Sequence, residues 1–497
     1  MELQFRKREV GCLKRLNWDC TLQEQTQELR LSDGLPDIGR VLCAWGQVVI
    51  RSKQWGSATA EVSGGVMAWV LCKAEDTQEL FCVDSWIPFR TRMDLPESER
   101  DGTLLVCPVL NCVEARSLSA RKLMIRACVH LAVDAVVPDK LSMYEPEDLP
   151  EDVCILEEKL SACLPVEAGE KPFLIEDVLQ LPDGSEQTKI LRYSLTPEVS
   201  EKRVVGGKVV FRGSAKLYVL YCTPEGELKH HCFDQPFSQL AELERDYEES
   251  ADVCIFPAVT GLELDVTADG SLDLKASLTG QYLITDTVEV STVADAYSPV
   301  RQTEAVEQPV LMPTVADLYE ESISAEAFSD TEVKEILDAE LYLSHPILSG
   351  SGESAAMNLE GNFLLLYKDG EGNAQSMLLP WQKQIQYPMP EEGNLMAVSI
   401  PAATVKGELS GRPEVKAKFE IQVTVAQELS RNTLSELRLG EQKMLDPSRP
   451  SVILCRPAGK SLWQLAKGMG STVESIVAAN GIVGQPDENQ LLLIPIL

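Results

Sequence analysis

The chain contains little of what catalytic and membrane-spanning proteins usually require. Histidine occurs four times in 497 residues, and aromatic residues make up 6% of the total. No apolar run approaches the roughly 20 residues of a transmembrane helix. The GxSxG and HExxH signatures of hydrolases and zinc peptidases do not occur. We therefore expect no enzyme activity, no catalytic residue, no cofactor and no membrane insertion.

Two short motifs could suggest a ligand, and both are incomplete. His230, His231 and Cys232 lie near Cys222, but a closed zinc site needs four ligands and no second tight pair follows. Residues 458–461 resemble the end of a phosphate-binding loop, yet Leu454 stands where that loop needs its first glycine. The sequence thus predicts neither a metal site nor a nucleotide site.

Positive charge is also scarce. Lys and Arg number 45 against 77 Asp and Glu, which gives a net charge of −32. Such a surface repels phosphate backbones and anionic lipid headgroups, so nucleic acid and membrane are not expected partners. It favours solubility, and a partner chosen by electrostatics would offer a basic patch.

The sequence also lacks the features of an exported protein. Basic residues near the start are followed by no apolar run, so no secretory signal is expected. The 14 cysteines include no CxxC pair. Free thiols in this number are typical of a reducing compartment. We therefore expect a cytoplasmic protein.

Most of the chain predicts β-strand. Alternating apolar and polar residues, rich in β-branched and aromatic types, fill residues 216–222, 362–367 and 416–425. Turns containing Gly or Pro bound many such runs. These patterns predict a mainly β fold of antiparallel sheets.

The predicted strands recur at a fixed spacing. Three apolar pairs each begin a similar pattern, and another apolar strand ends 31 residues after the first member of each pair. The pairs are Val41-Leu42, Ile190-Leu191 and Ile336-Leu337, and the later strands end at Cys72, Tyr221 and Tyr367. Successive copies are 149 and then 146 residues apart. The recurrence predicts three diverged copies of one β domain.

The three copies indicate where the domain boundaries lie along the chain. We predict β domains at residues 1–137, 171–292 and 323–430. Acidic, polar or proline-containing segments at residues 138–170, 293–322 and 431–450 read as linkers, the first with a short helix near residues 153–160. Residues 451–497 are a separate module.

The last segment predicts the order strand, helix, helix, strand. Ser461 with Gln464, and Ser471 with Glu474, are capping boxes at two helix starts. Asn480-Gly481 suits the left-handed turn that ends a helix. Apolar residues at helical spacing, together with the last strand, supply a core. The predicted core residues are Leu462, Trp463, Leu465, Ala466, Ile476, Val477 and Ile494.

Residues 452–495 resemble the LysM family. The matching positions are Gly459, Ser461, Leu462, Trp463, Ala466, Ala479, Asn480, Gly481, Gln490, Leu491, Ile494 and Pro495. The resemblance implies a ligand groove between the loop after the first strand and the loop before the second. Carried over to this chain, the partner-binding loop residues are Gly459, Lys460, Ser461, Asn480, Gly481, Ile482, Asn489 and Gln490.

Two departures from the family pattern leave the ligand open. The acidic residue after the first glycine is Lys460 here, and Asn489 replaces the glycine before the glutamine. Both lie on the groove loops. The groove would hold either a protein partner or, as the alternative, peptidoglycan or another polymer of N-acetylglucosamine.

The combination of repeated β domains with a terminal LysM resembles SipL-type sporulation proteins, which join DUF3794 (SPOCS) domains to a LysM domain. Residues 35–42 and 46–50 look like the opening of a DUF3794 domain, and the copy at 323–430 is similar. The resemblance implies a cytosolic scaffold of spore-coat assembly in the mother cell. It also implies that the LysM docks a SpoIVA-like coat-morphogenetic ATPase at the forespore surface.

Overall fold

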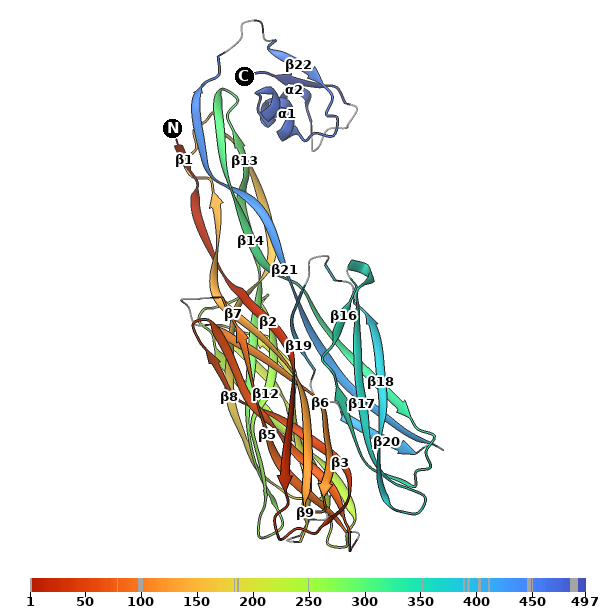
Figure 1. Ribbon diagram of the computed structural model, residues 1–497. Helices are drawn as coiled ribbons and strands as arrows, with labels where there is room; N and C mark the ends of the chain where they lie inside the picture. The colour runs from red at the N-terminus through yellow and green to blue at the C-terminus, as the bar shows by residue number, and fades with distance from the viewer. Residues whose placement is uncertain are drawn as a thin grey trace.

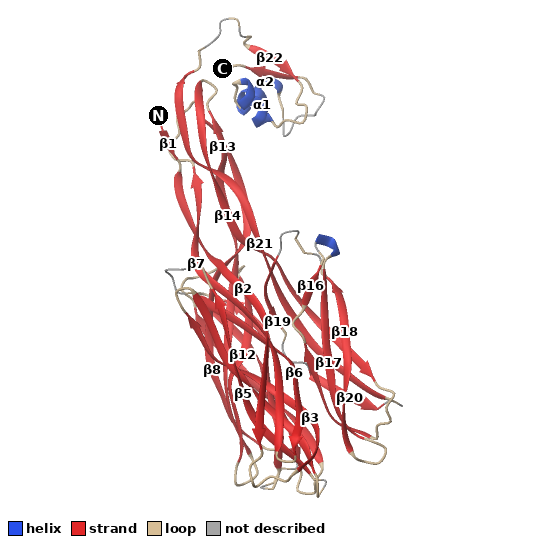
Figure 2. Cartoon of the chain, viewed as in Figure 1, coloured by secondary structure: helices blue, strands red, loops and turns tan. Residues whose placement is uncertain are grey.

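The computed structural model confirms the predicted mainly β fold. It describes residues 2–77, 79–96, 102–182, 184–185, 187–248, 250–350, 352–387, 389–390, 394–400, 404–409, 412–444, 448, 450–482 and 490–497. Within these ranges antiparallel strands dominate, and the two α-helices lie near the C-terminus (Figure 2). None of the helices in the described part of the chain has the length and apolar character needed to span a membrane.

The first β unit contains six strands in two antiparallel sheets. The sheets have the orders β2-β7-β6 and β3-β4-β5. The strands are β2 (Arg6–Arg30), β3 (Ile38–Trp55), β4 (Thr59–Ala74), β5 (Leu80–Asp94), β6 (Thr103–Ser119) and β7 (Lys122–Glu145). Apolar residues from both sheets, such as Val66 and Leu131, pack into one buried cluster. The unit is therefore a two-layer sandwich.

The second unit repeats this plan. Its sheets have the orders β12-β13-β8 and β11-β10-β9. The strands are β8 (Cys154–Leu179), β9 (Lys189–Val204), β10 (Lys208–Cys222), β11 (Leu228–Glu242), β12 (Asp252–Val266) and β13 (Leu272–Tyr297). Leu217 and Leu274, one from each sheet, lie in its shared core.

The third unit also has two antiparallel sheets, but some of its strands are broken into shorter pieces. Strand β21 pairs with β14, β19 and β20, and β17 pairs with β15, β16 and β18. A single 3-10 turn, η1 (Gly352–Ser354), precedes β17. The strands are β14 (Arg301–Phe328), β15 (Glu335–Leu343), β16 (Ile347–Ser349), β17 (Ala356–Lys368), β18 (Ala374–Gln386), β19 (Asn394–Ser399), β20 (Thr404–Leu409) and β21 (Pro413–Gln442).

The recurring apolar pairs lie at the contact between the three units. Leu42, Leu191 and Leu337 belong to one buried cluster, with Leu71, Leu220 and Leu366 from the neighbouring strands. Each unit contributes the same two positions. The repeat in the sequence thus corresponds to three sandwiches arranged around a common apolar centre.

The segments read as linkers are largely strand, which corrects that expectation. Residues 138–170 contain the end of β7 and β8 from its start through Glu170. Residues 293–322 contain the end of β13 and much of β14, and residues 431–450 begin with the end of β21. The predicted helix near residues 153–160 is part of β8, which pairs with β13. Strand β14 tolerates Pro309 and Pro313 because it is an edge strand, so these prolines disrupt no second ladder.

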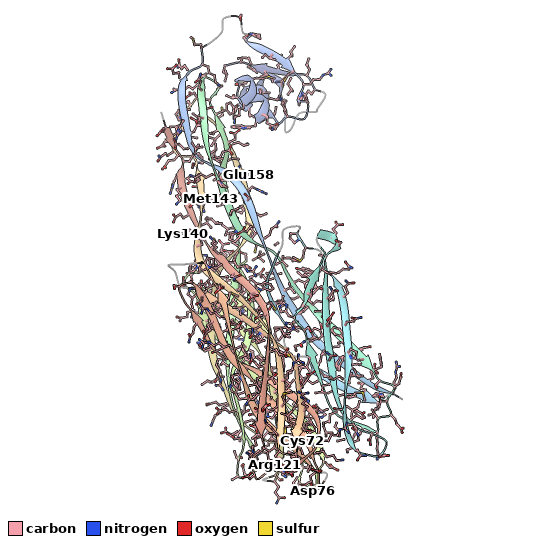
Figure 3. The ribbon with its side chains drawn as sticks, in the orientation of Figure 1. Cys72, Asp76, Arg121, Lys140, Met143 and Glu158 are labelled. Carbon is pink, nitrogen blue, oxygen red and sulfur yellow. The ribbon has the colours of Figure 1, made fainter. Side chains whose placement is uncertain are left out.

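The outer ends of β2, β7, β8, β13, β14 and β21 continue beyond the sandwiches as a stalk (Figure 1). Strand β1 (Glu2–Gln4) joins the stalk by pairing with β21. Phe5, Val293 and Leu437 are among the buried residues that fill it. Figure 3 shows Lys140, Met143 and Glu158 along the stalk, and Cys72, Asp76 and Arg121 at the opposite end of the molecule.

The terminal module (residues 451–497) has the predicted order. It consists of β22 (Val452–Cys455), α1 (Leu462–Met469), α2 (Val473–Asn480) and β23 (Leu492–Pro495). The Ser461–Gln464 capping box is confirmed, and Gly481 adopts the predicted left-handed conformation after α2. Gly470 adopts the same conformation after α1. The second box is wrong: Thr472 caps α2 by accepting from the Ser475 amide, because the helix begins one residue later and Ser471 is buried.

Candidate functional site

The candidate binding surface consists of the two loops beside the β22–β23 ribbon. Gly459 and Lys460 are exposed after β22, and Gly481 is exposed after α2. Ile482 is half-buried and Gln490 is exposed, whereas Asn489 lies outside the described residues. Gly459 adopts a φ of 79°, and a Cβ added there would meet no atom within 4 Å. The described parts of both loops are therefore accessible to a ligand.

Two of the predicted loop residues have structural roles as well. The Asn480 side-chain amide donates to the carbonyl oxygens of Ile476 (2.8 Å) and Leu493 (2.6 Å), and its carbonyl oxygen accepts from the Leu493 amide at 2.7 Å. It ties α2 to β23. The Ser461 hydroxyl accepts from the Gln464 amide at 3.2 Å. Changes at Asn480 or Ser461 would therefore disturb folding before they reported on binding.

Most of the predicted module core is buried. Leu462, Leu465, Ala466, Ile476 and Ile494 are buried, and Val477 packs against them as a half-buried residue. The strand alignment needs a correction at one position. Leu491, matched to the family pattern, is 56% exposed, whereas Leu492 is fully buried. Alternation in β23 explains this, because residues 492 and 494 face the helices while 491 and 493 face outward.

Trp463 lies at the contact between the module and the stalk. Its indole nitrogen donates to the Asp295 carboxylate at 2.8 Å, and its ring packs edge-to-face on Tyr297 with the ring centroids 4.8 Å apart. The Lys467 ammonium is 2.7 Å from the same carboxylate. The Tyr297 hydroxyl donates to the Ser471 carbonyl oxygen at 2.9 Å. Predicted as a core residue, Trp463 packs half-buried against the module core and also fixes α1 to the tip of β13.

Asp295→Ala should loosen this contact without unfolding the module. The substitution removes the acceptor shared by Trp463 and Lys467, and because Lys467 is nearly half exposed we expect a cost of about 1–2 kcal/mol for docking. Hydrogen exchange of α1 and of residues 292–297 should then accelerate. Glu289→Ala, which removes an exposed carboxylate from the same strand, is the matched control and should leave exchange unchanged. Equal exchange in both variants would contradict the docking role.

A buried ionic cluster lies at the centre of the three units. The Arg192 guanidinium is 3.0 Å from the Asp338 carboxylate and also pairs with Glu340. It lies over the rings of Trp45 and Tyr218, at 4.9 and 4.8 Å from their centroids. Burial works against the charge of Arg192, but the two carboxylates hold the pKa of Arg192 well above its usual value. Arg192 and Asp338 occupy equivalent positions in consecutive copies, but the repeat alone does not reveal that these two side chains meet.

A cleft of about 820 Å³ opens where the three units meet. β3 packs beside β12 and β15 beside β6, whereas β9 meets the third unit through side chains, with Arg192 paired to Asp338 and Glu340. The cleft is lined by residues of all three units, mainly from β3, β6, β9, β12, β14, β15 and β21. A Lys202–Glu320 ion pair joins β9 to β14 across it.

The titratable groups give little indication of chemistry. Burial raises the pKa of the Cys20 thiol to about 11 and that of the Cys72 thiol to about 12. Such thiols stay protonated at neutral pH and are weak nucleophiles. Burial lowers the pKa of His345 to about 4. Within the described ranges, no group of three or more His, Cys, Asp or Glu side chains could hold a metal ion.

Comparison with known proteins relates the second unit to one family. Residues 188–267 match the family model described as SipL, SPOCS domain. No curated protein and no solved structure matches the chain. The matched residues comprise β9, β10, β11 and β12. Residues 35–42 and 46–50, which resemble the opening of a DUF3794 domain, lie at the start of β3 and just before it, and β3 is the counterpart of β9 in the first unit. The second β unit is thus similar, over residues 188–267, to the SipL, SPOCS domain family.

Proposed function

We propose that this protein is a non-enzymatic scaffold of spore-coat assembly, whose LysM-like terminal module docks a SpoIVA-like coat-morphogenetic ATPase. The observation that supports the proposal most is the match of residues 188–267 to the SipL, SPOCS domain. The matched domain shares its chain with a terminal β-α-α-β module. The proposed site of action is the mother-cell cytoplasm, at the forespore surface.

The arrangement of the molecule suits this role. The sandwiches pack around a shared apolar centre, so they would act as one rigid body. The stalk carries the terminal module away from that body (Figure 1). Contacts from Asp295 and Tyr297 hold the helix α1, while the described loop residues Lys460 and Gly481 stay exposed. A partner could therefore reach the module without displacing the stalk.

Affinity purification from sporulating cells tests the proposal. The full chain should recover one dominant ATPase, and a chain lacking residues 451–497 should recover it at least tenfold less. Lys460→Glu, on an exposed loop, should weaken recovery with the melting temperature unchanged. Equal recovery by the full and shortened chains would refute docking through the module.

The glycan alternative calls for a separate titration. The sequence departs from the family pattern at Lys460 and Asn489, on the loops that would line a sugar groove. We therefore expect the full chain to bind N-acetylglucosamine oligomers no more tightly than the shortened chain. Micromolar binding that disappears when residues 451–497 are removed would favour the glycan function over the protein partner.

A further inference from the structure

The β22–β23 ribbon has a buried face and an apolar exposed face. Its register pairs Ile453 with Ile494 and Cys455 with Leu492. Leu492 and Ile494 are buried in the cluster that includes the helices, Cys455 packs against that cluster, and Ile453 is half-buried. The side chains between them point outward. Their exposed fractions are 46% for Val452, 58% for Leu454, 56% for Leu491 and 41% for Leu493. We call these four residues the ribbon patch.

The composition of the ribbon patch departs from what burial requires. A ribbon that is covered on one side normally alternates apolar and polar residues, with the polar ones toward water. Residues 491–494 are instead four consecutive apolar residues. Together the patch exposes on the order of 350 Å², a size that often marks an interaction site. Leu491 and Leu493 face outward, so neither the packing of the module core nor the formation of a turn requires leucine at these positions.

The stalk leaves the ribbon patch uncovered. The contacts between stalk and module run through Trp463, Lys467 and Ser471, which belong to α1 and the turn after it. Figure 1 shows α1 near the tip of β13 and β22 at the outer margin of the module. The patch is therefore free for a second molecule in the same arrangement that fixes α1.

The area of the patch and the charge of the chain distinguish two possible occupants of the patch, a second copy of this chain and a different protein. A symmetric contact between two copies of the patch would bury on the order of 700 Å², short of the roughly 1,200 Å² of a stable interface. Two chains of net charge −32 would also repel each other. A different protein that extends from the patch to the adjoining exposed residues Lys460 and Gln490 would avoid both costs. These observations favour a heterologous partner.

Charge also indicates what that partner presents. Val452 and Leu454 alternate with the buried side of β22, and Arg456 continues their row as an exposed residue. Extending the register places Arg456 beside Leu491. The outer face thus ends in a positive charge, although the chain as a whole is strongly acidic. A complementary surface carries an apolar row with a carboxylate at one end.

We propose that the ribbon patch docks a partner protein through an apolar row that ends in a carboxylate, with Arg456 receiving that carboxylate. The inference rests on the proposed function, because it names the surface through which the terminal module holds its protein partner. It differs from the groove loops, which contribute only the edge of the contact.

Binding of the full chain to the purified coat ATPase tests the surface. Leu454→Gln with Leu493→Gln should weaken binding at least thirtyfold with melting unchanged, since both side chains are already exposed. Arg456→Glu should weaken it about tenfold. Leu174→Gln with Leu378→Gln, 66% and 57% exposed in the second and third units, is the matched control and should bind like the unaltered chain. Unchanged binding by the Leu454/Leu493 variant would overturn the inference and leave the proposed function standing.

A second measurement separates the two proposals if the ATPase does not bind the unaltered chain. A photo-crosslinker at position 454 of the full chain, in sporulating cells, should trap a different protein at an apolar segment that contains a carboxylate. The same crosslinker at position 174 should not. That outcome would retain the ribbon patch although the ATPase is excluded. A crosslink only to a second copy, or none, would overturn the inference.

Discussion

Arg192→Met should destabilise the body of three sandwiches by about 3–5 kcal/mol, the usual cost of removing one partner from a buried ion pair. The substitution leaves Asp338, which is 3% exposed, and Glu340 without their cation. Tyr218, which donates to Asp338 at 2.5 Å, cannot compensate for a full charge. Urea unfolding followed by circular dichroism measures the loss.

Two further variants make the Arg192 experiment specific. Lys216→Met removes a cation from a partly exposed pair with Glu198 in the same unit, and we expect a loss below about 1 kcal/mol. Adding Asp338→Leu and Glu340→Gln to Arg192→Met should recover much of the lost stability, since these uncharged replacements leave no unpaired charge buried. A loss for Arg192→Met as small as that for Lys216→Met would show that the cluster does not hold the units together.

Leu492→Ala should cost the terminal module about 2–5 kcal/mol, because Leu492 is fully buried between the ribbon and the helices and its truncation leaves a cavity. Hydrogen exchange of α2 in the full chain should accelerate at least thirtyfold. Leu491→Ala, one residue earlier and 56% exposed, should change that exchange less than twofold.

The same pair of leucines also separates folding from binding. Leu491→Ala should reduce partner binding while the module stays folded, because Leu491 belongs to the ribbon patch. If Leu491→Ala destabilised the module as much as Leu492→Ala, the strand register would be wrong. The inference about the patch would then lose its basis.

Local patterns in the sequence predicted much of the fold. Alternation predicted the strands, and Ser461 with Gln464 predicted the start of α1, because both depend on neighbouring residues alone. The spacing of Leu42, Leu191 and Leu337 predicted a threefold repeat. The linkers were wrong because Pro309 and Pro313 normally break a ladder, and the sequence does not show that β14 has a free edge.

The sequence by itself determined the β class, the repeat and the order of elements in the terminal module, since period and capping are local properties. Only the tertiary structure placed Arg192 against Asp338 and Glu340, and Trp463 against Asp295. Those contacts join residues 146, 148 and 168 positions apart. No pattern among neighbouring residues indicates that these side chains meet. Tertiary packing also decided which face of the ribbon is covered, and so whether Leu491 or Leu492 belongs to the core.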